Sequence, residues 1–397
     1  MSSDARRILL IRALRAFAYG FGSVLLGVSL EAAGFSGTQV GAILTATLVG
    51  SAILTALLGY VGDRIGRRTA HVGLSLLMAG AGTIVAVTDS FWVLLLAALS
   101  GTVATAALES GPFVTLEQAI IPQTSPPEQR NRVFGHYNAV AAVAGSLGAL
   151  AAGGPAFLRG FFPALPTSQQ WFLLYAALGI VAALLAARLS ARVEVGQTAE
   201  RQGAPLRRSR RIVLGLSGLF ALDAFGGGFV LQAFIVYWFR VRFDASPELL
   251  GLVFFGVGIL QSLSFLVAAR LAGRIGLVNT MVFTHLPSNV LLAAIPFAPN
   301  LSSALALLLA RFALSQMDVP ARQSYVVAVV DPDERTAAAS VTNATRTVAQ
   351  AVSPALAGVL LQSLALGAPF ILAGALKGIY DLGLLAAFRN VKPKEET

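Results

Sequence analysis

Long apolar runs alternate with short polar segments along the whole chain. A helix needs about 20 apolar residues to cross the hydrocarbon core of a bilayer, and only helices or closed barrels satisfy their backbone hydrogen bonds there. The runs therefore predict an all-α membrane protein. Twelve transmembrane helices are expected, at residues 8–33, 36–60, 69–88, 91–121, 133–158, 169–192, 212–240, 247–271, 277–297, 300–329, 336–361 and 368–389.

Basic residues indicate which side of the membrane each loop faces. An even number of spans returns the C-terminus to the side of the N-terminus. With both termini in the cytoplasm, most of the 29 Lys and Arg residues fall in cytoplasmic loops and ends, as the positive-inside rule requires. We therefore expect cytoplasmic termini and a multi-pass protein of the cell membrane.

The chain reads as two related halves. A polar segment at residues 194–211 carries several arginines and separates them. The sequence around Glu117 matches the sequence around Arg322 at a constant shift, and Asn138 and Asn343 keep that shift. We expect an N-terminal six-helix bundle at residues 1–193, a basic cytoplasmic linker at 194–211 and a C-terminal six-helix bundle at 212–397.

The most specific stretch is the polar hinge Gly59-Tyr60-Val61-Gly62-Asp63-Arg64-Ile65-Gly66-Arg67-Arg68, between the second and third spans. One interpretation is a charged turn that only stops two helices. A stop signal needs only the arginines, whereas Gly62 and Gly66 permit close backbone approach or left-handed dihedral angles. The spacing Gly-x-x-x-Asp-Arg-x-Gly-Arg-Arg resembles the loop motif between helices 2 and 3 of the major facilitator superfamily of secondary transporters.

The resemblance implies a conformational latch made of Gly59, Asp63, Arg64, Gly66, Arg67 and Arg68. In such a latch Asp63 would face the positive N-terminal end of helix 11 in one conformation only, and the arginines would brace it. The resemblance covers the whole chain. It implies twelve helices in two pseudo-symmetric six-helix bundles, with helices 1, 4, 7 and 10 around a central cavity.

Composition agrees with a polytopic membrane protein. Hydrophobic residues make up 56% of the chain, charged residues 12%, and the mean hydropathy is +0.74, whereas soluble domains carry about 25% charged residues. The net charge of +10 needs no nucleic-acid partner, because the positive-inside rule explains the bases. The chain has no cysteine, no clustered histidines and no nucleotide-binding loop, so we expect no metal and no cofactor. We also expect no enzyme activity, and a monomer in the lipid bilayer.

Charged residues within the spans mark the candidate site for solute and protons, because burying each costs at least about 2.5–3.5 kcal/mol. Those on helices 1, 4, 7 and 10 are Arg15, Glu109, Asp223, Arg311 and Asp318. Arg12 lies one turn inside its span and is expected to extend to the cytoplasm. Glu109 precedes Gly111-Pro112, a pair that suggests a broken or bent helix lining a site.

Asp223 is the favoured protonation site, and Glu109 is its rival. A carboxyl group that is buried or paired differently in two conformations holds its proton differently, which is the coupling that an exchanger requires. The structural alternative is that Asp223 permanently neutralises a buried arginine. Replacement of Asp223 would then leave an unpaired charge.

Two further interpretations concern helix ends. Glu117 and Arg322 occupy equivalent positions where helices 4 and 10 reach the inner surface, one an acid and the other a base. They are expected to form a cytoplasmic gate. The aromatic face of helix 7, with Phe234, Tyr237 and Trp238, is interpreted as an anchor at the membrane interface, with substrate contacts as the alternative.

The residues and the resemblance together predict a secondary active transporter that moves a small organic solute by alternating access. We expect coupling to protons, and efflux rather than uptake. Mixed charge in the spans favours a polar, zwitterionic or ionic solute. The alternative is an uncoupled facilitator, or a lipid or lysolipid flippase, on the same fold. A receptor or a membrane-embedded enzyme is disfavoured because the short linker leaves no room for a soluble sensory or catalytic domain.

Overall fold

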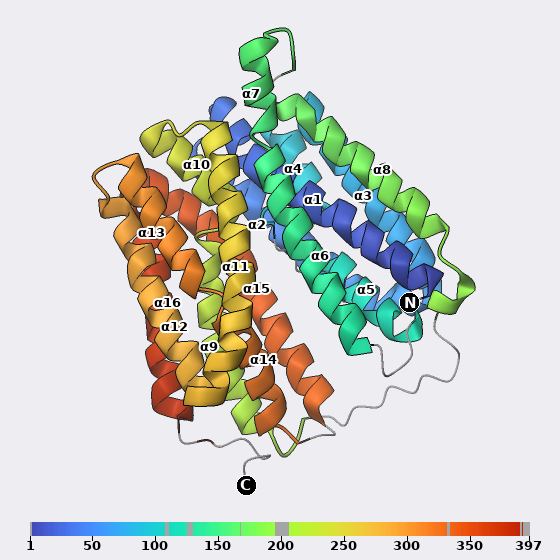
Figure 1. The fold of residues 1–397 in the computed structure, drawn as a ribbon, viewed down its shortest axis with the longest axis vertical. Coiled ribbons are helices and arrows are strands. Elements are labelled where there is room, and N and C mark those ends of the chain that lie inside the picture. The colour runs from blue at the N-terminus through green and yellow to red at the C-terminus, as the bar shows by residue number, and fades with distance from the viewer. Residues whose placement is uncertain are drawn as a thin grey trace. The chain divides into compact units, whose positions relative to one another are not determined.

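The computed structural model describes residues 2–107, 111–124, 130–166, 168–194, 206–331, 334–389 and 391. These residues form helices joined by turns, and none of them lies in a strand. The α-helices, drawn in Figure 1, are α1 (Ser3–Ala32), α2 (Gly37–Ile65), α3 (Arg67–Val87), α4 (Phe91–Leu99), α5 (Pro112–Thr124), α6 (Arg130–Ala151), α7 (Gly154–Phe161), α8 (Phe172–Ala187), α9 (Arg210–Gly228), α10 (Gln232–Phe243), α11 (Pro247–Ile275), α12 (Leu277–Ala294), α13 (Leu301–Leu314), α14 (Asp318–Val329), α15 (Arg335–Ser363) and α16 (Ala368–Phe388).

Ten helical segments within the described residues are long and apolar enough to cross a membrane. The expected spans at 91–121 and 336–361 are not among them. The first is divided between α4 and α5, and the second, α15, contains Asn343, Arg346 and Gln350, which lower its hydropathy. The helical membrane fold is confirmed. Twelve spans and cytoplasmic termini stay predictions.

Contacts between the helices divide the chain into two compact units. The first unit contains Met1–Ala199 and Leu231–Gly258, and the second contains Glu200–Val230 and Ile259–Thr397. Helix α10 and the start of α11 therefore contribute to the first unit, although they follow the linker in the sequence. Two six-helix bundles joined at 194–211 stay a prediction.

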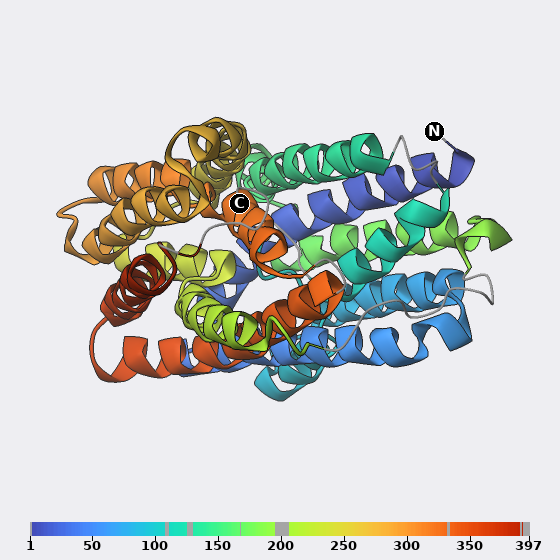
Figure 2. The ribbon, with the colours of Figure 1, turned by 90° about the horizontal axis from the view of Figure 1, so that it is seen from below.

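Helix α1 lies at the centre of the first unit, where it packs against α6, α8 and α10. Every residue of α1 from Ala18 to Leu30 is buried, as expected for a helix that is apolar on all sides. Figure 2 shows α1 and α6 side by side. Small residues permit this approach, since a Cβ atom on Gly148 would collide with the carbonyl oxygen of Phe17. In lipid, such close packing supplies much of the attraction between helices.

The aromatic residues of α10 are buried within the first unit. Phe234 and Trp238 are fully inaccessible to solvent, and the Tyr237 hydroxyl donates a hydrogen bond of 2.8 Å to the Phe35 carbonyl oxygen. The interpretation of these three residues as an interface anchor is therefore wrong. Helix α1 packs against α10, so the aromatic face meets protein.

Helix α4 ends at Leu99 and α5 begins at Pro112, so the expected break in this span is present. Within the break, the hydroxyl groups of Tyr19 and Tyr175 donate to the carbonyl oxygen of Thr102 at 3.3 and 2.5 Å. The backbone N–H of Ala233 donates to the carbonyl oxygen of Thr105 at 3.1 Å. Irregular backbone at membrane depth is tolerated only where protein or water satisfies it, and here α1, α8 and α10 supply the donors.

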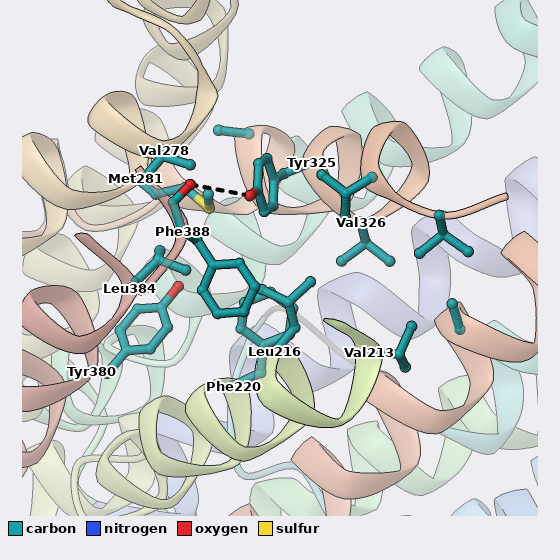
Figure 3. Close-up of a cluster of buried hydrophobic side chains, with 14 of the residues drawn as sticks. Val213, Leu216, Phe220, Val278, Met281, Tyr325, Val326, Tyr380, Leu384 and Phe388 are labelled. Carbon is teal, nitrogen blue, oxygen red and sulfur yellow. Dashed lines mark hydrogen bonds between the residues drawn. The ribbon is translucent and has the colours of Figure 1, made fainter. Parts of the chain in front are cut away.

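The hydrophobic core of the second unit comes mainly from α9, α12, α14 and α16. Figure 3 shows this core, with Phe220 of α9 and Tyr380 of α16 among its larger side chains. The Tyr325 hydroxyl donates to the Phe388 carbonyl oxygen at 3.3 Å, the dashed line in Figure 3, which ties α14 to the end of α16. Phe220 and Tyr380 also border a cluster of buried charges.

Candidate functional site

The first unit buries one carboxylate among three donors, which we call the Glu117 cluster: Arg15, His71, Glu117 and Tyr137. Nη2 of Arg15 and the hydroxyl of Tyr137 lie 2.8 and 2.7 Å from Oε2 of Glu117. Nε2 of His71 lies 2.9 Å from Oε1. The four side chains come from α1, α3, α5 and α6, and none is more than 1% exposed. Packing of these helices therefore fixes the carboxylate with both of its oxygens bonded.

Aromatic rings lie against Arg15 of the Glu117 cluster and against the neighbouring Arg12. The guanidinium carbon of Arg15 lies 4.0 Å from the centre of the Phe113 ring, and that of Arg12 lies 4.7 Å from the centre of the Tyr137 ring. Arg12 is only 5% exposed. The expectation that Arg12 extends to the cytoplasm is therefore wrong. A cation over an aromatic face is stabilised by about 2 kcal/mol or more when desolvated, which favours the buried position.

The second unit holds a denser group, the Asp223 cluster: Asp223, His285, Arg322, Arg346 and Lys377. Nζ of Lys377 lies 2.6 Å from Oδ1 of Asp223, whereas Nη1 atoms of Arg346 and Arg322 lie 2.8 and 3.2 Å from Oδ2. Nε2 of His285 lies 3.8 Å from Oδ1. Five helices, α9, α12, α14, α15 and α16, thus meet at one carboxylate.

Two more carboxylates extend the Asp223 cluster. Asp318 accepts from Nη1 of Arg322 at 3.0 Å, one helical turn away on α14. Asp381 lies 2.9 Å from Nδ1 of His285, and it accepts from Nδ2 of Asn289 at 2.8 Å. His285 therefore lies between two carboxylates, Asp223 and Asp381, on opposite ring nitrogens.

Arg311 lies on α13 of the second unit and interacts electrostatically with Asp223. Its side chain is 7% exposed, with the guanidinium carbon 4.5 Å from the centre of the Phe312 ring. Of the five residues expected in the solute and proton site, the structure brings Asp223, Arg311 and Asp318 into the second unit and Arg15 into the first. Glu109 lies outside the described residues.

The latch residues that the structure describes hold the start of α3. Gly66 has φ +86°, a left-handed conformation that suits glycine. The backbone N–H groups of Arg67 and Arg68 donate to Oε2 and Oε1 of Glu194 at 2.6 and 3.2 Å, and Nη1 of Arg67 donates to the carbonyl oxygen of Ala119 at 2.8 Å. These bonds satisfy N–H groups that a helix start leaves free.

Other parts of the latch and the gate stay predictions. Gly59 and Asp63 belong to a stretch of α2 whose side chains lie outside the described part, and Arg64 is exposed. Glu117 bonds within the first unit and Arg322 within the second, as given above. Glu117 is therefore the central carboxylate of one buried cluster, and Arg322 is one of the bases of the other.

His71 and His285 are not among the residues expected in the site. A sequence signal for both is a second polar residue one turn later in an apolar run, Ser75 after His71 and Asn289 after His285. Oγ of Ser75 lies 3.4 Å from Nδ1 of His71, and Nδ2 of Asn289 lies 3.2 Å from Nδ1 of His285. Within the described residues, no group of three or more His, Asp or Glu side chains is arranged to hold a metal ion.

Comparison with known proteins gives a family match across the chain. The sequence model of the Major Facilitator Superfamily matches residues 8–313 and 216–397. An uncharacterized membrane protein of Saccharomyces cerevisiae is 26% identical over 416 aligned positions, covering 96% of this chain and 93% of that protein.

Two solved transporter structures have a similar fold. The crystal structure of the nucleoside transporter NupG is similar with a TM-score of 0.73 and 15% identity, covering 98% of this chain and 99% of that one. A D-xylose–proton symporter is similar with a TM-score of 0.72 and 16% identity over the full length of both chains. At these identities the similarity describes the fold.

Proposed function

Because the chain belongs to the major facilitator superfamily, whose members are secondary transporters, we propose that it moves a small polar solute by alternating access and exchanges it for protons. The membrane is the cell membrane and the direction is efflux. The protein acts as a monomer. An uncoupled facilitator or a lipid or lysolipid flippase on the same fold is the second candidate.

The observation that carries proton coupling is a buried imidazole against a buried carboxylate in each unit. His71 faces Glu117 in the first unit, and His285 faces Asp381 and Asp223 in the second. Histidine is the side chain whose charge changes between pH 5 and 8. A facilitator needs no such group, and a lipid pathway would favour apolar linings over buried ion pairs.

Each imidazole is held against its carboxylate by neighbouring side chains. Arg15 and Tyr137 share Glu117 with His71, and Phe113 packs against the His71 ring. A change that separates the imidazole from the carboxylate breaks the pair between which a proton can be passed. Alternating access supplies such a change, since helices of a transporter move against each other.

The same applies to His285, whose ring meets carboxylates on both sides and Tyr380 on its edge. Asp223 itself contacts three basic side chains, Arg322, Arg346 and Lys377. Those contacts favour the structural alternative for Asp223, a fixed counter-ion. In this proposal the exchanged proton is carried by the His285–Asp381 pair, with Asp223 setting the charge around it.

Exchange for protons is tested in proteoliposomes with a solute found by thermal-shift screening, because a ligand that binds the folded state raises its melting temperature. An exchanger accumulates solute when the lumen is more acidic than the medium. A symporter accumulates it with the opposite gradient. Accumulation that ignores the pH gradient would support the uncoupled facilitator and contradict the proposal.

The histidines are tested by His285→Gln and His71→Gln, with His136→Gln as the matched control because His136 is exposed on α6. We expect the two buried variants to bind solute and exchange it at equilibrium, yet to lose at least about tenfold in gradient-driven accumulation, while the control behaves as the unchanged protein. If both buried variants still concentrate solute, the proton does not travel through these histidines.

A further inference from the structure

One buried cation of the second unit has guanidinium atoms without a hydrogen-bond partner. Arg311 is 7% exposed, and its Nε and Nη1 atoms have no partner among the described residues. One turn later, Ser315 is 6% exposed and its Oγ also has no partner in the described part of the chain. Buried N–H and O–H groups in proteins are nearly always hydrogen-bonded. The donors of Arg311 and Ser315 are therefore positioned to bind an acceptor that is not part of the described chain.

The protein's own acids are already bound to other cations. Asp223 forms ion pairs with Lys377, Arg346 and Arg322, and Asp318 also pairs with Arg322. Asp381 is held by His285 and Asn289. Among the described residues of this interior, four basic side chains thus face three carboxylates, and Nε and Nη1 of Arg311 are left without an acceptor. One more negative charge would therefore balance the charges of these side chains in the second unit.

Arg311 also lies near the middle of the candidate membrane span Leu301–Val326. Its Cα is about 15 Å along α13 from Leu301, at 1.5 Å per residue, which is about half the 30 Å thickness of the hydrocarbon core. The helix is interrupted just beyond it, since α13 ends at Leu314 and α14 begins at Asp318. Interrupted helices near the bilayer midplane are typical of solute sites in transporters.

We propose that Arg311 and Ser315 bind an oxyanion group, carboxylate or phosphate, of the transported solute. The Nε and Nη1 groups of the guanidinium can each donate a charge-assisted hydrogen bond to an oxygen atom, and the Ser315 hydroxyl adds a third donor. The ring of Phe312 holds the guanidinium from one face. This inference rests on the proposed transport function and assigns its solute to the anions.

The test compares anions with related neutral molecules by thermal shift on purified protein. The probes are benzoate against benzamide, succinate against succinamide, and phenyl phosphate against phenol. We expect at least one anion, and not its neutral partner, to raise the melting temperature. Preference for phenyl phosphate over the carboxylates would identify phosphate as the bound group. A protein stabilised equally by both members of each pair, or by none of the anions, contradicts the proposal.

Variants assign the binding to Arg311. Arg311→Gln should weaken the anion at least about tenfold, Arg311→Lys and Ser315→Ala less, and Arg270→Gln, at an exposed position of α11, not at all. Because Nε and Nη1 of Arg311 bond to no described residue, Arg311→Gln without ligand should melt at the same or a higher temperature. A lower melting temperature without ligand, or unchanged anion affinity, would show that Arg311 serves the fold and overturn the assignment.

The two proposals fail separately. Gradient-driven accumulation of a neutral solute, with no anion effect on the melting temperature, would overturn the oxyanion site and leave proton exchange standing. Anion binding that depends on Arg311, without any response of transport to the pH gradient, would keep the site and overturn the coupling.

Discussion

Single residues inside this protein are stabilised by partners far away in the sequence. Asp223 meets Arg322, Arg346 and Lys377, which follow it by 99, 123 and 154 residues. A sequence shows which positions are charged and which face of a helix carries them. It does not show which other helix that face meets, so the candidate charges could be predicted from the sequence and their pairing could not.

The Glu117 cluster gives a prediction for one residue. Glu117→Gln leaves the buried Arg15 without its carboxylate, and loss of one partner from a buried ion pair costs about 3–5 kcal/mol. We therefore expect a clear fall in melting temperature in detergent. Asp89→Asn, at an exposed position, is the control and should change it little.

Tyr137→Phe tests whether the carboxylate is the cause, because it removes one hydrogen bond of 2.7 Å and keeps the ring under Arg12. A loss of about 1.5–3 kcal/mol is expected for a bond to a charged group. If Glu117→Gln melts at the temperature of the unchanged protein, Arg15 does not depend on Glu117 for its burial.

At the scale of elements, the sequence predicted that the fourth span is broken, from Gly111 and Pro112, but not where the break begins. Helix α4 already ends at Leu99. The run from Thr102 onward is apolar enough to read as helix, and what allows it to leave the helix is a set of donors from α1, α8 and α10. Tertiary bonds of this kind are invisible to local periodicity.

Helix packing in the first unit gives the next prediction. Gly148→Ala would push a methyl group into the Phe17 carbonyl of α1, and overpacking of this kind costs about 1–3 kcal/mol. Gly80→Ala on α3 is the matched control, since its new Cβ would meet nothing within 4 Å. Gly148→Ala should therefore melt at a lower temperature than Gly80→Ala. Equal temperatures would mean that α1 and α6 can separate slightly at no cost.

On the scale of the whole chain, a carboxylate holds each side of the polar linker. Glu194 accepts from the N–H groups that start α3. Glu334 accepts from the N–H groups of Ser209, Arg207 and Arg208 at 2.9, 2.8 and 2.9 Å, where the chain enters α9. The backbone N–H groups of Ser209 and Arg207 lower the pKa of Glu334 from 4.5 to about 2.

The lowered pKa of Glu334 predicts a pH dependence. A carboxyl group whose pKa falls on folding stabilises the folded state above its unfolded pKa and loses that contribution as the pH falls through the folded pKa. The melting temperature of the unchanged protein should therefore exceed that of Glu334→Gln by a constant amount from pH 7 to 5, and the gap should close between pH 4.5 and 2. A gap that is the same at pH 2 and at pH 7 would contradict this account.

The family, the helical class and the charged positions were thus accessible from the sequence, because apolar length and local motifs encode them. The membership of α10 was not. It follows the linker in the sequence, yet it packs against α1, its Ala233 bonds to the fourth span, and its Arg240 meets Glu31.

The position of α10 has a consequence for biosynthesis. Chains emerge from the ribosome N-terminus first, and domains generally fold in that order. When residue 194 has been made, the face of α1 that receives α10 still lacks its covering helix. The first unit of this protein can reach its final packing only after residue 258 has followed, so its maturation must wait for a segment that belongs, by sequence, to the second half.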